Sequence, residues 1–115
     1  MGERSAAAIA LNSLGHIERQ RGELTNAAAR HEESLALFGE VGNERGVAYT
    51  LSSLGVAALE RGDLERASAL HRESLSLYER LGDKSGVALV LTYLGDVAAR
   101  TTKNAPPSFT MTPWP

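Results

Sequence analysis

The chain has 115 residues, with 12 Lys and Arg against 14 Asp and Glu, no cysteine and a formal net charge of -2. Such a length allows one modest core, the charge gives no positive field for nucleic acid, and the lack of cysteine excludes disulfides and thiol chemistry. No stretch approaches the roughly 18 apolar residues of a membrane span, and the start, MGERSAAAIAL, lacks a secretory signal. We therefore expect a cytoplasmic protein that binds neither nucleic acid nor membrane.

The first predicted unit, residues 7–46, is helical because its apolar residues recur at steps of three and four. Gly22 is expected to end the first helix in the left-handed conformation, and Glu23 to open the second. Gly42 and Asn43 repeat this punctuation before the next unit. Both pairs match the expected turn less well than Gly-Asp does, and each helix is predicted to hold about 16 residues, or about 24 Å.

The second unit, residues 47–86, is a near copy of the first, with 17 identities in 40 positions aligned without a gap. Gly62-Asp63 and Gly82-Asp83 are its helix-ending pairs. Its first helix carries the apolar stripe Val47, Ala48, Leu51, Leu54, Gly55 and Ala58, and its second carries Leu64, Ala67, His71, Leu75, Tyr78 and Leu81. One such hairpin cannot bury its stripe alone, so the repetition predicts stacked hairpins that share a continuous core.

A third copy opens at residue 87 with VALVLTYLGDVAAR and stops halfway, near residue 102. The sequence thus predicts an all-α solenoid of two and a half hairpins, five helices, within residues 1–103. Gly15, Gly55 and Gly95 stand at the same place in the three units. Because a glycine inside a helix costs about 1 kcal/mol relative to alanine, we expect each to mark a close helix contact that a side chain would block.

Residues 104–115, NAPPSFTMTPWP, break the pattern, and Pro106 and Pro107 exclude the missing second helix there. Two interpretations stay open. The tail is disordered and no part of the fold, or it is extended and polyproline-like, with Phe109, Met111 and Trp114 docked on the open end or in a neighbour's groove. In either case we expect Val90 and Tyr93 to be left uncovered, and to be buried by self-association into a homodimer or higher homo-oligomer.

These features together resemble the tetratricopeptide repeats, over about residues 7–100. The resemblance rests on Leu-Gly in the first helix, Gly-Asp or Gly-Glu at the turn, a small Ala in the second helix, then Leu-x-Leu and a terminal Gly-Asp. The 40-residue period is similar to an extended variant found in kinesin light chains, spindle-orientation adaptors and bacterial regulators. The family often has aromatic residues where this chain has leucine, alanine or glutamate, which implies a core rich in leucine and alanine.

The resemblance implies a right-handed superhelix whose concave wall, lined by the first helix of each unit, binds an extended peptide or a partner helix. It also implies a mainly apolar groove, because the lysines of a carboxylate clamp are missing. Transferred position by position, the partner-binding residues are Ile9, Asn12, His16, Arg19, Tyr49, Ser52, Val56, Leu59, Leu89, Thr92 and Asp96.

The expected function is a protein–protein interaction module, a fragment of a larger bacterial regulator; the alternative is a structural or self-association segment without a separate ligand. We expect no enzymatic activity, cofactor or metal. The Arg61-Gly62-Asp63 tripeptide lies in register with a helix turn, and His31 and His71 are better explained as packing residues than as ligands. Ser34 and Ser74 are expected to be small packing residues, without the glycines of a nucleophile elbow.

Overall fold

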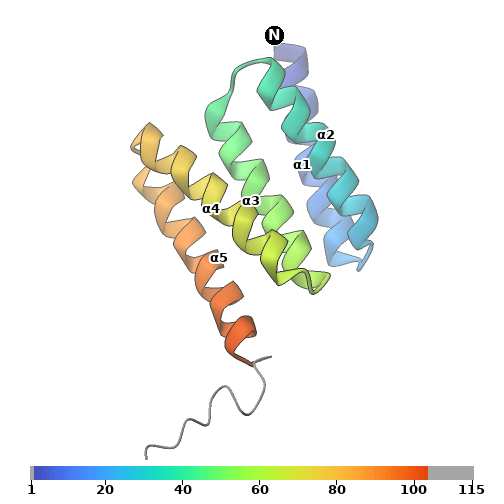
Figure 1. Cartoon of the computed structure of the whole chain (residues 1–115). Coiled ribbons are helices and arrows are strands. Elements are labelled where there is room, and N and C mark those ends of the chain that lie inside the picture. Colours follow the sequence, from blue (N-terminus) through green and yellow to red (C-terminus); the bar gives the residue numbers. More distant parts are fainter. Residues whose placement is uncertain (1, 104–115) are drawn as a thin grey trace, which may run out of the picture.

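The computed structural model describes residues 2–103, and within them all regular structure is α-helical. The helices are α1 (Gly2–Gln20), α2 (Leu24–Glu40), α3 (Glu44–Glu60), α4 (Leu64–Leu81) and α5 (Lys84–Lys103). Each packs mainly on its neighbour in the chain, so α1/α2 and α3/α4 form hairpins and α5 stands alone against α4 (Figure 1). The predicted two and a half hairpins are confirmed.

Four connections of the same design join the helices. Gly62 has a φ of +85°, and the backbone N–H of Asp63 donates to the carbonyl of Ala58 at 2.9 Å, which closes the end of α3. The Asp63 carboxylate then accepts from the N–H of Arg66 and caps α4. Asn43 caps α3 in the same way, whereas Glu23 makes no such bond, so the sequence-based expectation of a poorer turn is right for Glu23 and wrong for Asn43.

The core follows α3, the middle helix of the stack. A cluster of Leu51, Leu54 and Ala58 of α3 packs on Ala67 and Leu70 of α4 and extends to other helices. A second cluster lies nearer the start of α5 and consists of Ala48, Tyr78 and Val90. Because α3 has neighbours on both sides, most of its residues are buried, and it holds the two repeats together.

Gly15, Gly55 and Gly95 occupy equivalent positions in the three units, and the first two mark close helix contacts, as predicted. A Cβ atom on Gly15 would lie 2.8 Å from the ring of His31, and one on Gly55 would lie 2.5 Å from the ring of His71. Both distances are far below a van der Waals contact, so each glycine leaves the space that an imidazole fills. Gly95 differs, because no atom of the described residues lies within 4 Å of a Cβ atom placed on it.

The expectation that Val90 lies uncovered is wrong. Val90 is completely buried between α5, α3 and α4, and Tyr93 is half-buried with its ring stacked on His71 at 5.2 Å between centroids. The reason is helical phase, since both side chains lie on the side of α5 that faces the preceding repeat. The small and apolar residues that α5 leaves exposed include Ala88, Leu91, Gly95 and Ala98. Phe109, Met111 and Trp114 of the predicted tail lie outside the described residues.

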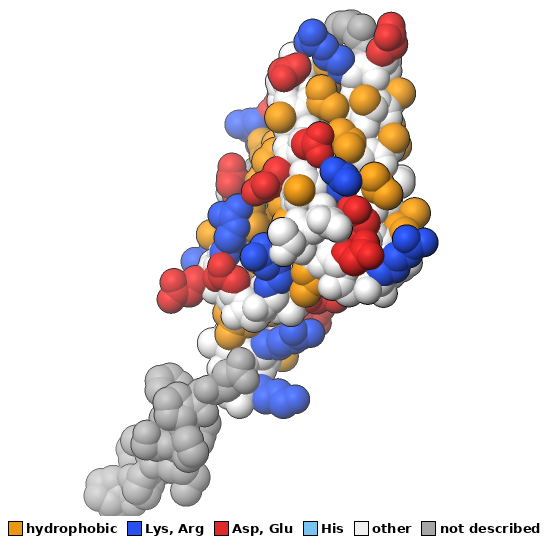
Figure 2. All heavy atoms as spheres, turned by 90° about the vertical axis from the view of Figure 1, so that its right-hand side faces the viewer, with side chains coloured by type: hydrophobic (Ala, Val, Ile, Leu, Met, Phe, Trp, Pro, Cys, Tyr) orange, Lys and Arg blue, Asp and Glu red, His pale blue; other side chains and the backbone are white. Residues whose placement is uncertain are grey.

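Charged side chains of both signs are mixed over the surface. Figure 2 shows this on the side occupied by α1 and α2, where acidic and basic groups alternate with apolar ones. Arg4 pairs with Glu40, and Arg80 pairs with Glu44, which links α4 to α3. None of the described helices is both long and apolar enough to cross a lipid bilayer.

Candidate partner-binding groove

One face of the stack is lined by α1, α3 and α5, and it carries two hollows. The first, here called the apolar hollow, has a volume of about 580 Å³. Ile9, Tyr49 and Leu89, one from each of the three helices, form its rim, and Phe38 and Tyr78 of the second helices lie at its base. Because these three rim positions are 40 residues apart, each repeat contributes the same place to one continuous track.

The second hollow, here called the polar hollow, lies about two helical turns further along the same face and has a volume of about 240 Å³. Its lining comprises His16, Arg19, Tyr49, Ser52, Ser53, Val56 and Tyr93. Tyr49 lines both hollows and is 41% exposed, so it stands between them. A spacing of seven residues, as from Ile9 to His16, returns a side chain to the same side of a helix and so joins the two hollows into one groove.

Hydrogen bonds and ion pairs across the helices hold the polar hollow in shape. His16 Nε2 and Tyr49 Oη share a hydrogen bond of 3.1 Å. Arg19 of α1 donates to the Glu60 carboxylate of α3, also at 3.1 Å. Burial, and then the nearby Arg19 charge, lower the pKa of His16, so its imidazole is neutral at pH 7 and can either donate or accept.

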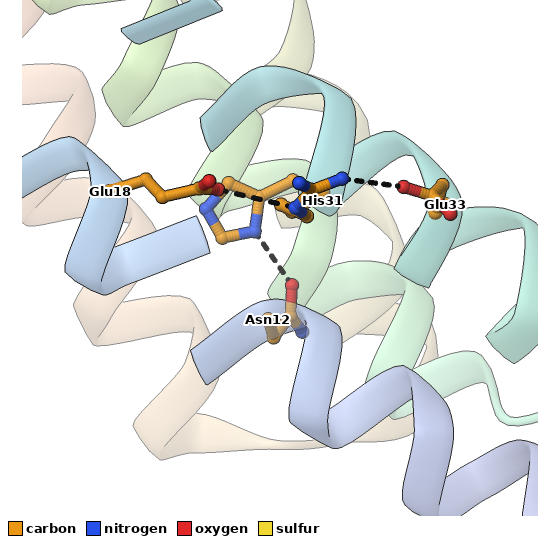
Figure 3. Close-up of polar contacts among 5 residues, drawn as sticks. Asn12, Glu18, His31 and Glu33 are labelled. Carbon is orange, nitrogen blue, oxygen red and sulfur yellow. Dashed lines mark hydrogen bonds and ion pairs between the residues drawn. The ribbon is translucent and has the colours of Figure 1, made fainter. Parts of the chain in front are cut away.

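A buried polar network lies directly beneath this face. Asn12 Oδ1 accepts from His31 Nδ1 at 2.8 Å (Figure 3). Asn12 Nδ2 donates to Thr50 Oγ1 at 2.9 Å. Thr50 in turn donates to the carbonyl of Gly46. The network joins α2 to α1 and α1 to α3, and it positions the groove-facing helices relative to each other. Arg30 of α2 meets Glu18 and Glu33 beside it (Figure 3).

The structure brings most of the predicted groove residues together. Ile9, Tyr49 and Leu89 meet at the apolar hollow, and His16, Arg19, Ser52 and Val56 meet Tyr49 at the polar hollow. Thr92 and Asp96 are exposed on α5 but line neither hollow.

Three of the predicted residues are buried, which corrects their assignment as accessible contacts. Asn12 is 5% exposed and belongs to the network with His31 and Thr50. Leu59 is 7% exposed and packs in the core cluster. Ser52 forms part of the floor of the polar hollow, but it is 1% exposed and its hydroxyl donates to Ser74. Burial leaves these side chains to shape the groove from below.

Sequence reasoning missed the aromatic base of the apolar hollow, Phe38 and Tyr78. A signal was present, because Gly46 and Gly86 each follow one of these rings by eight residues, and each glycine provides the space in which the ring lies. Ser34 and Ser74 also do more than fill space. Their hydroxyls donate to the carbonyls of Ala8 and Ala48 at 2.7 and 2.6 Å, the same bond in each repeat.

His31 and His71 are packing residues in this structure. His31 is completely buried, His71 is 1% exposed, and each fills the space opposite a glycine. Within residues 2–103, no three His, Asp or Glu side chains gather closely enough to hold a metal ion.

Comparison with known proteins agrees with this architecture. No curated protein matches the sequence. A family model described as Tetratricopeptide repeat matches residues 6–80, which is more than half of the chain and covers α1 to α4 almost completely. Repeats of this family are in general non-catalytic modules for protein–protein interaction. The chain belongs to the tetratricopeptide repeat family.

Proposed function

We propose that the groove formed by α1, α3 and α5 binds an extended peptide segment or a helix of a partner protein. The observation that carries this proposal is the apolar hollow, where Ile9, Tyr49 and Leu89 stand in a row across three helices above two aromatic rings. When a ligand covers exposed apolar side chains in a hollow, their removal from water favours binding. A second reason is internal, since hydrogen bonds and packing already hold the groove open in the unbound chain.

The two hollows call for different groups on the partner. The apolar hollow suits one or two large hydrophobic side chains. The polar hollow offers the Tyr93 hydroxyl and the neutral His16 imidazole, which suit backbone amides or a polar side chain of the ligand. Arg19 contributes less charge than its type suggests, because Glu60 already pairs with it. We therefore expect a ligand that is apolar at one end and uncharged and polar at the other.

A selection from a random peptide library displayed on phage tests the proposal without knowledge of the natural partner. Peptides enriched on the wild-type chain should carry large hydrophobic residues. Their binding, followed by fluorescence anisotropy, should weaken at least about tenfold in Tyr49→Glu and in Val56→Glu, since a buried carboxylate opposes an apolar ligand. Far-ultraviolet circular dichroism should show unchanged helix content in both variants.

Ser76→Glu is the matched control, because Ser76 is exposed on α4 and lines neither hollow. It should bind the selected peptides as the wild type does. Undiminished binding by both groove variants, or enrichment of peptides without hydrophobic residues, contradicts the proposal.

We further infer that such a module works in the cytoplasm as part of a larger bacterial regulatory protein, with a protein or peptide as its partner. The surface charges of mixed sign and the absence of cysteine support the cytoplasmic location. A second candidate function, self-association into a homodimer, is favoured by the exposed stripe on α5. Light scattering coupled to gel filtration separates the two, because a groove module needs no second copy, whereas a self-association segment elutes as an oligomer.

A further inference from the structure

Helix α1 carries a line of exposed residues on the open side of the first hairpin, here called the α1 seam. Its members recur at alternating steps of four and three, and they are Glu3, Ala7, Ala10, Leu14, Ile17 and Arg21. Arg21 follows the helix, but its N–H still donates to the carbonyl of Ile17 at 3.1 Å, so it keeps the helical phase. Such a seven-residue repeat places its members along one side of a helix, as in the contact line of a two-stranded coiled coil.

The same side of the next first-type helix is buried. Forty residues on from Ala10, Leu14 and Ile17, α3 has three residues that are at most 4% exposed, namely Thr50, Leu54 and Ala57. Thr50 accepts a hydrogen bond from α1, and Leu54 and Ala57 lie beside α2. On α1 the corresponding residues are exposed, Leu14 by 40% and Ile17 by 46%. A side that packs on a neighbouring helix in the second repeat is therefore open to water in the first.

The surface around the seam is free of charge. From residue 5 to the end of the helix, every exposed residue of α1 is uncharged, and these residues are Ala6, Ala7, Ile9, Ala10, Ser13, Leu14, Ile17 and Gln20. By contrast, α4 exposes charged residues along its length, among them Glu65, Arg66, Arg72 and Glu73. Figure 2 shows apolar side chains gathered on the side of the stack that α1 and α2 form. A helix laid on the seam removes no charge from water along its middle.

A second copy of α1, running antiparallel, matches the seam position by position. With the midpoint of the contact at residue 12, Ala10 faces Leu14 of the second copy and Ala7 faces Ile17, so each large side chain meets a small one. Glu3 faces Arg21 of the second copy at both ends, which pairs opposite charges. A parallel pairing would instead set Glu3 against Glu3 and Arg21 against Arg21.

The exposed stripe of α5 lacks this match. Its members are Ala88, Leu91, Gly95 and Ala98, and one step further along the same side lie Lys84 and Thr102. An antiparallel pair of α5 helices would therefore have no opposite charges at its ends, and Leu91 would be its single large apolar side chain on each copy. Charge and size both favour α1 as the contact helix.

We propose that two copies of this chain associate through α1, packed antiparallel along the seam, with Glu3 of each copy paired with Arg21 of the other. The groove stays free, because Ile9 and His16 each precede a seam residue by one position and so lie about 100° round the helix. The seam is short beside a standard interface of about 20 to 30 residues a side, so the dimer is weak. It dissociates at the dilution of a gel-filtration column, where a stable oligomer would have another cause.

Sedimentation equilibrium at protein concentrations from about 10 μM to about 1 mM measures this pairing. The mass should rise with concentration from the 12.3 kDa of one chain towards twice that value. Leu14→Asp and Ile17→Asp should each weaken association at least about tenfold, because the new carboxylate would be buried in the seam. Leu91→Asp, an equal change at the exposed apolar residue of α5, should leave association unchanged. Circular dichroism should show the same helix content in all three variants.

The end charges give a second test at exposed positions, where the fold does not depend on the side chain. Glu3→Arg and Arg21→Glu, each alone, set like charges against each other and should weaken association several-fold at low salt. The double variant, and equally a mixture of the two single variants, restores opposite charges at both ends and should associate as the wild type does. A parallel pairing predicts no such recovery in the double variant.

Three results overturn the proposal. One is a monomer at every concentration. Another is association that Leu91→Asp weakens and Leu14→Asp does not, which would assign the contact to α5. The third is a double charge variant that associates as weakly as the two single variants.

Discussion

At the scale of single residues, the histidines explain how the helices approach each other. His31 and His71 each fill the space left by a glycine on the facing helix. His31 is satisfied at Nδ1 by Asn12, whereas the residue equivalent to Asn12 in the second repeat is Ser52, which bonds to Ser74 and leaves His71 stacked on Tyr93. The same residue type thus fills the same space with a polar partner in one repeat and an aromatic partner in the other.

Burial of these rings makes the stability of the fold depend on pH. Burial, followed by the neighbouring His16 and Arg19, lowers the pKa of His31 to about 4, and burial lowers that of His71. The unfolded chain therefore binds more protons than the native chain at a pH between about 6.5 and 4. The stabilising contribution is complete above the unfolded pKa and is lost as the pH falls through this window, by up to about 3 kcal/mol for His31.

Urea unfolding of the wild type and of His31→Gln at several pH values between 7 and 4 checks this prediction. Gln keeps a donor for Asn12 but does not titrate, so the variant should lose less free energy of unfolding than the wild type across the window. Equal slopes for the two proteins would show that His31 is not the group responsible. His16 and His71 are present in both proteins, so the difference between the two slopes reports the His31 ring.

At the scale of elements, the helix ends differ in quality although their backbone geometry is the same. All four turns have a glycine with positive φ, but only Asn43, Asp63 and Asp83 add a side-chain cap. The Asp83 carboxylate accepts from the N–H of Gly86 and from the Arg45 guanidinium. Both bonds lower the pKa of Asp83, and the Gly86 bond is the larger cause. The start of α5 is thereby tied to α3.

Asp63→Ala should lower the free energy of unfolding by about 1 kcal/mol, because the N–H of Arg66 loses its acceptor at the start of α4. Glu23→Ala at the matching place before α2 should change it by less than about 0.5 kcal/mol, since Glu23 makes no cap bond. Chemical denaturation of the two variants beside the wild type measures both. A larger loss from the Glu23 change than from the Asp63 change would contradict this explanation of the turns.

At the scale of the whole molecule, position in the stack decides how much a residue contributes. Leu14 and Leu54 are equivalent in the two repeats, but Leu54 is 4% exposed and Leu14 is 40% exposed. The difference arises because α3 has the first hairpin on one side and α5 on the other, whereas α1 has a neighbour on one side only within the described residues. Identical side chains therefore bury different areas.

Leu54→Ala should cost about 2 to 4 kcal/mol, as expected for a cavity in a packed core, and Leu14→Ala should cost less than half as much. Thermal and urea unfolding of the two variants measure the difference. Equal losses would mean that the neighbours on both sides of α3 do not make Leu54 more important for stability than Leu14.

The sequence by itself determined the helical period, the ends of the helices, the hairpin unit and the family, because these depend on local spacing and on glycine and aspartate at fixed places. It also placed Ile9, Tyr49 and Leu89 on one face, since positions 40 residues apart are equivalent in any stack. Only the tertiary structure decided that Asn12 and Leu59 are buried and that Val90 is covered while Leu91 is exposed. The physical reason is that exposure depends on the rotation of each helix against its neighbours, and a one-residue step turns a side chain by about 100°, from the buried side of α5 to the open one.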